Sequence, residues 1–134
     1  MGILIDTNVL IKAEKGTIVL DSHIEKRKDE EFFISVITAS ELLHGVWRAK
    51  DEAIQVRRSA FVEAVLTSIA ILSIDLPTAR SHAQLWARLL SDGQMIGVHD
   101  SWIAASCINH GLHLITDNVK EFERIPGLQI EQWT

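Results

Sequence analysis

The segment Ile3–Leu10, with the sequence ILIDTNVL, decides the fold that we expect. Its first three residues are all apolar, which is typical of a short strand buried on both faces. The apolar run ends abruptly at Asp6, and Val9, Leu10 and Ala13 follow at helical spacing. A buried strand that passes directly into a helix indicates an α/β protein built on a parallel sheet.

The same alternation of buried strands and amphipathic helices continues along the chain. Runs rich in β-branched and aromatic residues indicate strands, and apolar residues at i, i+3, i+4 and i+7 indicate helices. We expect strands at residues 32–37, 69–74, 112–116 and 128–131, and helices at residues 38–47, 54–69, 77–90, 101–110 and 118–123. This order predicts an α/β/α sandwich with a central, mostly parallel sheet.

Length and composition restrict the class of protein. The 134 residues suit one domain, and we expect a single domain over residues 1–134. Hydrophobic residues make up 47% and charged residues 23% of the sequence, the balance of a compact globular protein. No apolar run approaches the ~20 residues of a membrane span, and no secretory signal is recognised. A lone cysteine, Cys107, cannot form an intrachain disulfide, so we expect a cytoplasmic protein.

The net charge of −5 argues against a protein that binds nucleic acid through a broad basic surface. Acids gathered in one pocket and neutralised by cations would leave the remaining surface less acidic than this total suggests. The positions of the acids therefore matter more than their number.

Four acids stand where the carboxyl ends of the expected strands should meet. Asp6 follows the first strand, Glu41 lies one turn into the helix after the second, Asp100 precedes the helix before the fourth, and Asp117 follows the fourth strand. In open parallel sheets, ligands bind outside the carboxyl ends of the strands, because loops from neighbouring strands converge there. We therefore expect these four side chains to share one crevice.

Each of these acids has an alternative role in helix capping. Asp6, Asp100 and Asp117 stand at or before expected helix starts, where Asp accepts hydrogen bonds from free backbone N–H groups. The segment Thr38–Glu41 has the spacing of a capping box. Asp75 serves as a comparison, since it precedes a proline at a helix start and capping is sufficient to explain it. Caps have no reason to gather at one edge of a sheet, so the set of four favours a site.

Clustered carboxylates repel one another unless a cation neutralises them. Hard oxygen ligands in this number suit Mg²⁺, with Mn²⁺ as a possible substitute. A divalent ion polarises a phosphoryl oxygen and activates water, and a second ion about 3.5–4 Å away would stabilise the leaving oxygen. The set therefore predicts hydrolysis of phosphodiester bonds, with these metal ligands and catalytic residues: Asp6, Glu41, Asp100 and Asp117.

Four ordered motifs carry a resemblance to a known family. They are Ile3–Leu10, Ser40–Leu42, Gly97–Asp100 followed by Ile103–Ala105, and Leu114–Asn118 followed by Glu121–Leu128. Together these motifs resemble the PIN-domain ribonucleases, and most of all the VapC-type toxins of bacterial toxin–antitoxin pairs. The resemblance runs from the first expected strand to the last.

The resemblance implies a PIN-like fold and an Mg²⁺-dependent endoribonuclease that a small antitoxin holds inactive. Asp6, Glu41 and Asp100 match the family's first three acids, with Asp6 and Asp100 as direct metal ligands. The fourth position has two adjacent candidates, Asp117 and Asn118, and its charge favours Asp117. Because family members are commonly dimers with antitoxin bound across the groove, the resemblance also implies a homodimer.

Two other functions remain open from the sequence. In a phosphatase of the haloacid-dehalogenase kind, the aspartate after the first strand attacks phosphorus. That chemistry needs a second aspartate two residues later, where this chain has Asn8. A PIN-like domain that acts only as a binding or scaffold module, without turnover, is the other alternative.

Several further side chains have expected places. Trp47, Trp86 and Trp102 occupy apolar helix positions and are expected in the core, whereas Trp133 is a candidate for exposure. His99 is next to Asp100, where it could touch substrate or simply lie on the surface. The densest cations could contact RNA phosphates or form surface salt bridges, and they are Lys26, Arg27, Lys28, Arg48, Lys50, Arg57 and Arg58.

Overall fold

The computed structural model describes residues 2–134; Met1, the first residue of the expected domain, lies outside the described part. Five strands form one sheet in the order β3-β2-β1-β4-β5, and every pair of neighbours is parallel. The strands are β1 (Gly2–Ile5), β2 (Glu31–Ser35), β3 (Ala70–Leu72), β4 (His113–Ile115) and β5 (Ile130–Glu131). The predicted parallel sheet is confirmed.

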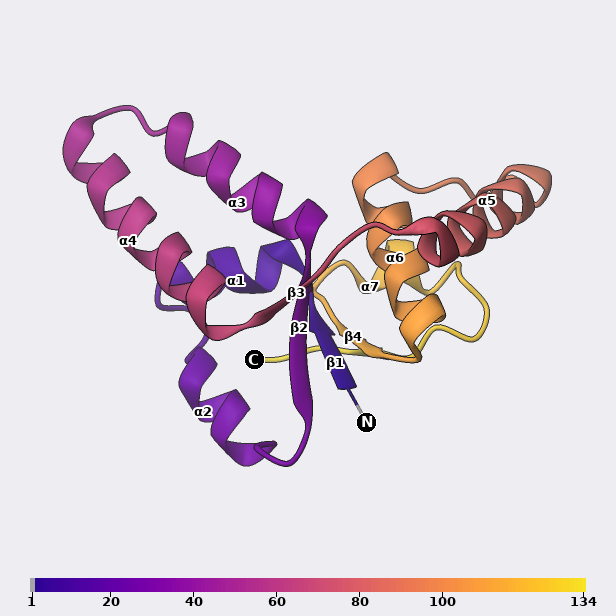
Figure 1. Cartoon of the computed structure of the whole chain (residues 1–134), viewed down its shortest axis with the longest axis horizontal. Helices are drawn as coiled ribbons and strands as arrows, with labels where there is room; N and C mark the ends of the chain where they lie inside the picture. The colour runs from indigo at the N-terminus through magenta and orange to yellow at the C-terminus, as the bar shows by residue number, and fades with distance from the viewer. Residues whose placement is uncertain (1) are drawn as a thin grey trace.

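Helices cover both faces of this sheet. They are α1 (Thr7–Glu14), α2 (Leu20–Lys26), α3 (Val36–Trp47), α4 (Glu52–Ser68), α5 (Leu76–Ser91), α6 (Val98–His110) and α7 (Val119–Phe122). Figure 1 shows α1 to α4 on one side of the sheet and α5 to α7 on the other. β1 serves both layers, because Ile3 and Ile5 belong to one core cluster and Leu4 to the other.

Helix α3 begins earlier than its apolar pattern predicts, at Val36 rather than Thr38. The cause is Ser35, the last residue of β2, whose hydroxyl accepts a hydrogen bond from the backbone N–H of Ile37 at 3.0 Å. Ser35 therefore caps the helix. The capping-box alternative for Glu41 is wrong, because this acid lies well inside the helix.

Helix α6 also begins before its expected start. Its N-cap is Gly97, which has no side chain to cap with, and its first residue is Val98. Asp100 consequently lies in the first turn rather than ahead of it. The third strand spans only Ala70–Leu72 within the expected residues 69–74, and Ile69 is the C-cap of α4.

The tryptophans differ from expectation. Trp47 and Trp86 are 78% and 53% exposed, so their placement in the core was wrong. Trp133, the candidate for exposure, is only 4% exposed and packs in a core cluster. Helical spacing shows which side chains share a face, but it does not show whether another element covers that face. Cys107 is a free, buried cysteine.

The strand order creates a switch point at β1. From β1 the chain moves outwards to β2 and β3, and it then returns to place β4 and β5 on the opposite side (Figure 1). Loops diverge at such a point and leave room for a ligand at the carboxyl ends of the strands. Asp6 follows β1 and Thr116 follows β4 at this position. Within residues 2–134, no helix combines the length and the apolar character needed to cross a bilayer.

Candidate active site

Asp6 stands at the switch point and is 3% exposed. Its Oδ1 atom accepts a hydrogen bond from the backbone N–H of Thr7 at 2.8 Å, which makes it the N-cap of α1. Its Oδ2 atom accepts a hydrogen bond from the hydroxyl of Thr116 at 2.7 Å. Since both oxygens are held by groups at the ends of β1 and β4, the carboxylate is fixed in position before any ligand arrives.

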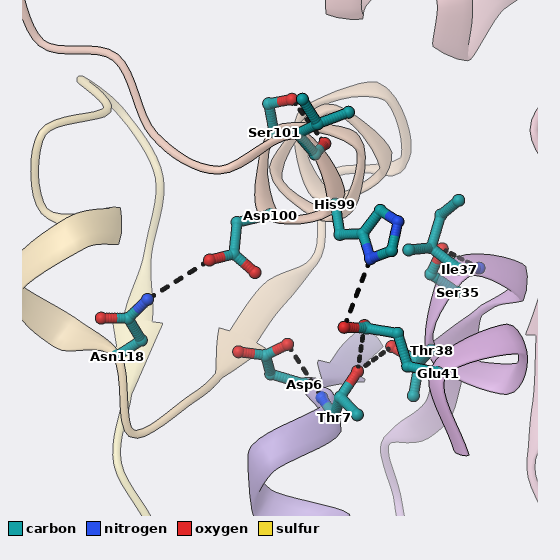
Figure 2. A network of polar contacts seen from close by, with 11 residues as sticks. Asp6, Thr7, Ser35, Ile37, Thr38, Glu41, His99, Asp100, Ser101 and Asn118 are labelled. Carbon is teal, nitrogen blue, oxygen red and sulfur yellow. Dashed lines mark hydrogen bonds and ion pairs between the residues drawn. The ribbon is translucent and has the colours of Figure 1, made fainter. Parts of the chain in front are cut away.

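Glu41 reaches the same place from α3. The hydroxyl of Thr7 donates to its Oε1 atom at 2.7 Å, and the hydroxyls of Thr7 and Thr38 lie 3.0 Å apart. Its Oε2 atom lies 3.4 Å from Nδ1 of His99, which extends from the first turn of α6. Figure 2 shows Glu41 and Thr7 beside Asp6, with His99 above them. Thr7 therefore links the first two acids, through its backbone to Asp6 and through its side chain to Glu41.

Asp100 faces Asp6 from α6, and the two carboxylates point into the same space in Figure 2. Nδ2 of Asn118 lies 3.3 Å from Oδ2 of Asp100 and 2.9 Å from Oε2 of Glu121. The backbone N–H of Gly97 donates to Oε1 of Glu121 at 2.7 Å. Glu121 thus joins α7 to the start of α6 and lies directly against Asp100.

Asp117, the favoured fourth acid, is directed elsewhere. Its Oδ2 atom lies 2.7 Å from Nζ of Lys12 on α1. Its Oδ1 atom accepts a hydrogen bond from Gln132 at 3.3 Å. The structure therefore brings together Asp6, Glu41 and Asp100, while Asp117 is engaged by a cation and an amide at the edge of the site.

Burial and mutual repulsion perturb these carboxyl groups. Burial, and then the charges of Glu41 and Asp117, raise the pKa of Asp6 despite its two hydrogen bonds. Burial, followed by the charges of Asp6 and Glu121, raises the pKa of Asp100 to about 7. Burial also acts to raise the pKa of Glu121, but its hydrogen bonds, first among them the one from Gly97, outweigh that effect and lower the pKa. The site is short of positive charge.

The donor set suits a hard divalent cation. No three His, Cys, Asp or Glu side chains within residues 2–134 gather closely enough to form a metal site by themselves. Mg²⁺ does not need such a group, since it is usually held by one or two carboxylates and keeps several waters. Asp6 and Asp100 supply two carboxylates with raised pKa values. A bound cation would offset the burial and the mutual repulsion that raise them. The residues present fit the ion.

Glu121 is the site residue that sequence reasoning missed. It belongs to a short helix after the fourth strand, three residues beyond Asn118, so both side chains can lie on the same side of α7. That spacing was the available signal. Of the two candidates for the fourth position, Asn118 is the one that contacts Asp100.

The densest cations of the sequence lie partly in ion pairs. Arg27 pairs with Glu30 and Glu131, and Nε of Arg58 lies 3.4 Å from Glu14. For these two arginines the surface salt bridge is confirmed.

Known proteins resemble this chain over nearly its whole length. The PIN domain family matches residues 3–128. Ribonuclease VapC1 of Rickettsia felis is 36% identical over 130 residues, which cover 97% of this chain and 95% of that protein. The tRNA(fMet)-specific endonuclease VapC of Salmonella typhimurium is 34% identical over 133 residues, which cover 97% of this chain and 96% of that protein.

Solved structures show the same likeness. A chain in the crystal structure of VapBC2 from Rickettsia felis bound to a promoter DNA fragment matches with a TM-score of 0.91 at 27% identity, and 100% of each chain is covered. A chain of the DNA-bound VapBC from Salmonella typhimurium matches with a TM-score of 0.90 at 30% identity over 100% of this chain and 99% of that one. The chain therefore belongs to the PIN domain family, and within it to the VapC ribonucleases of toxin–antitoxin systems.

Proposed function

We propose that this VapC ribonuclease is a magnesium-dependent endoribonuclease, with Asp6 and Asp100 as the acids that hold the cation. The observation that carries the proposal is the pair of buried or half-buried carboxylates facing one another, whose pKa values are both raised. A divalent cation held by Asp6 and Asp100 would neutralise charge on the phosphate and would lower the pKa of water.

The chain's own residues have separate tasks in this proposal. The hydroxyl of Thr116 and the backbone N–H of Thr7 hold Asp6, so that its carboxylate does not have to reorganise when the cation binds. The hydroxyl of Thr7 holds one oxygen of Glu41 and leaves the other towards the crevice, on the side of His99. In this proposal, Glu41 orients water or a ligand of the cation.

On the opposite side, Asn118 and Glu121 orient Asp100. Glu121 is further held by the backbone of Gly97, so α7 and the start of α6 act as one support for the third acid. Asp117 has the role of an outer acid, because it pairs with Lys12. Its charge contributes to the field at Asp6 without requiring direct contact with the cation.

RNA is the substrate that the family membership supports, and two relatives named tRNA(fMet)-specific endonucleases make this transfer RNA the first substrate to test. A cognate antitoxin is the partner that the VapBC neighbours support. We also propose a homodimer, as the resemblance to VapC-type toxins implies. The phosphatase alternative loses its support, because Asn8 occupies the place of the second aspartate that it needs and its side chain accepts a hydrogen bond from Asp117 N.

The proposal is tested by incubating the purified protein with total RNA and with tRNA(fMet) in Mg²⁺, in Mn²⁺ and in EDTA. We expect cleavage in both metals, none in EDTA, and losses of about 100-fold or more in the Asp6→Ala and Asp100→Asn variants. Cleavage that persists in EDTA or in both variants would contradict the proposal.

The scaffold alternative gives a different result in the same assay. A domain that only binds a partner would cut no RNA in any metal, and Mn²⁺ would not raise its melting temperature. Metal-dependent stabilisation of the wild type, lost in Asp6→Ala, therefore separates an enzyme from a scaffold even before the preferred RNA is known.

A further inference from the structure

The first turn of α6 carries Asp100 but has an unusual start. Its N-cap, Gly97, has no side chain, and no side-chain cap hydrogen bond is made there. Ser101 contributes a local bond instead, since its hydroxyl donates to the carbonyl oxygen of Val98 at 2.7 Å. The turn that presents an acid of the site is therefore stabilised by groups other than an N-cap.

His82 reaches this turn from α5. Its Nε2 atom lies 2.9 Å from the hydroxyl oxygen of Ser101, and the histidine is 7% exposed. A hydroxyl has a single hydrogen, and that of Ser101 is used on Val98. His82 must therefore donate from Nε2, which fixes the neutral ring in one tautomer. Burial lowers the pKa of His82, in agreement with an uncharged ring.

Aromatic packing fixes the plane of this ring. His82 stacks on Trp102 with ring centroids 3.7 Å apart and an interplanar angle of 5°, and Trp86 lies tilted at 5.9 Å. Trp102 follows Ser101 on α6, so the histidine contacts two consecutive residues after Asp100. A buried, stacked side chain that donates one directed hydrogen bond is well suited to set the position of a backbone turn.

We propose that His82 is a positioning residue for Asp100: through Ser101 it holds the first turn of α6 in the place where Asp100 faces Asp6. This inference rests on the proposed function, since it assumes that Asp100 holds the cation. Nothing in it requires His82 to touch the substrate or to change its charge.

Two substitutions separate the hydrogen bond from the packing. His82→Phe keeps an aromatic ring against Trp102 but removes the donor. His82→Gln removes the ring but keeps an N–H donor on a side chain of similar reach. Ser101→Ala removes the same link from the other side with the smallest change of volume, which covers the case in which His82→Phe fails to fold. His110→Gln, at the exposed end of α6, is the matched control.

Three readouts are measured on the full chain. The first is hydrogen exchange of the backbone N–H of Ser101, which donates to the carbonyl of Gly97 at 2.9 Å. The second is Mn²⁺ affinity by calorimetry without RNA. The third is the separation of kcat from KM for RNA cleavage. Only a positioning role links a faster exchange in this turn to weaker binding of the metal.

In His82→Phe and Ser101→Ala, we expect exchange of the Ser101 N–H about fivefold faster, the factor for one lost hydrogen bond. Mn²⁺ affinity and kcat should fall about tenfold with KM nearly unchanged. His82→Gln should recover most of the exchange protection and part of the Mn²⁺ affinity. The double variant that combines His82→Phe with Ser101→Ala should be no worse than Ser101→Ala alone. His110→Gln should match the wild type.

Exchange and Mn²⁺ affinity in both His82→Phe and Ser101→Ala equal to those of the wild type would overturn the inference. So would a loss in His82→Gln larger than that in His82→Phe, because the ring packing, which His82→Phe keeps, would then matter more than the hydrogen-bond donor. If the wild type itself neither binds Mn²⁺ nor cuts RNA, the proposed function fails and this inference fails with it. If the wild type binds Mn²⁺ and cuts RNA but the exchange of Ser101 N–H is unchanged in the variants, only the role of His82 is refuted.

Discussion

Nζ of Lys12 lies 2.7 Å from Oδ2 of Asp117, so the acid that directly follows β4 is already paired within the chain. The neighbouring residue, Asn118, turns the other way and contacts both Asp100 and Glu121. Adjacent residues in the turn after β4 thus have different roles. Asp117 pairs with Lys12 of α1, and Asn118 joins Asp100 to Glu121 of α7.

The first prediction compares Glu121, which contacts Asp100, with Asp117, the fourth acid that the sequence favoured. Glu121→Gln should lower cleavage about tenfold or more, because the group that shares a hydrogen bond with Asp100 loses its charge. Asp117→Asn should stay within about threefold of the wild type, since its carboxylate is committed to Lys12. Single-turnover cleavage rates check this order. A larger loss in Asp117→Asn would return that residue to the metal site.

The second prediction separates activity from stability. Asp75 caps α5, accepting from the backbone N–H of Thr78 at 3.0 Å and from its hydroxyl at 2.6 Å, as the sequence predicted for this residue. Asp75→Ala should lower the urea midpoint of unfolding, because the N-cap of α5 is lost, and should leave cleavage unchanged. Glu41→Gln should lower cleavage and leave the free energy of unfolding nearly unchanged. Urea unfolding and RNA cleavage measured on both variants test the distinction, and equal losses of activity would refute it.

The third prediction concerns the link between the first two acids. Thr7→Val keeps the volume of the side chain and the backbone bond to Asp6, but it removes the hydroxyl that holds Glu41 at 2.7 Å. We expect cleavage to fall about tenfold with circular dichroism unchanged. Thr17→Val, at an exposed position outside the site, is the control. Full activity in Thr7→Val would show that Glu41 does not need this support.

The fourth prediction follows from the raised pKa of Asp100. Because folding raises this pKa from 3.8 to about 7, the folded chain holds the proton more tightly than the unfolded chain. The contribution of Asp100 to stability is therefore fully present below about pH 4 and is lost as the pH rises through about 7. Without metal, Asp100→Asn should melt above the wild type at pH 8, and the gap should narrow at pH 5.

Added metal provides the control for this pH effect. Mn²⁺ at pH 8 should raise the melting temperature of the wild type and leave Asp100→Asn nearly unchanged, so the order of the two proteins reverses. A difference between them that is independent of pH, with or without Mn²⁺, would show that Asp100 titrates as an ordinary exposed carboxyl.

Much of this arrangement could be predicted from the sequence because it depends on short-range patterns. The run Ile3–Ile5 is apolar on both sides of the pleat, which requires a buried parallel strand and places Asp6 at its carboxyl end. The convergence of Asp6, Glu41 and Asp100 then follows from the parallel sheet. Figure 2 shows this convergence directly.

Features set by packing between distant elements could not be predicted in this way. Charge favours Asp117 over Asn118 in the sequence, and only the folded chain shows that Lys12 from α1 pairs with Asp117 while Asn118 contacts Asp100. Glu121 becomes part of the site because it accepts a hydrogen bond from the backbone N–H of Gly97, which lies far from it in sequence. Trp86 is exposed for a similar reason, since no element of the described chain covers that face of α5.

The location of the cation is the most direct test of the central claim. Crystals soaked in MnCl₂ can be measured near the manganese absorption edge, so that an anomalous difference map locates the ion independently of activity. We expect a peak between the carboxylates of Asp6 and Asp100. A map with no peak there, or with manganese bound only beside Asp117, would contradict it.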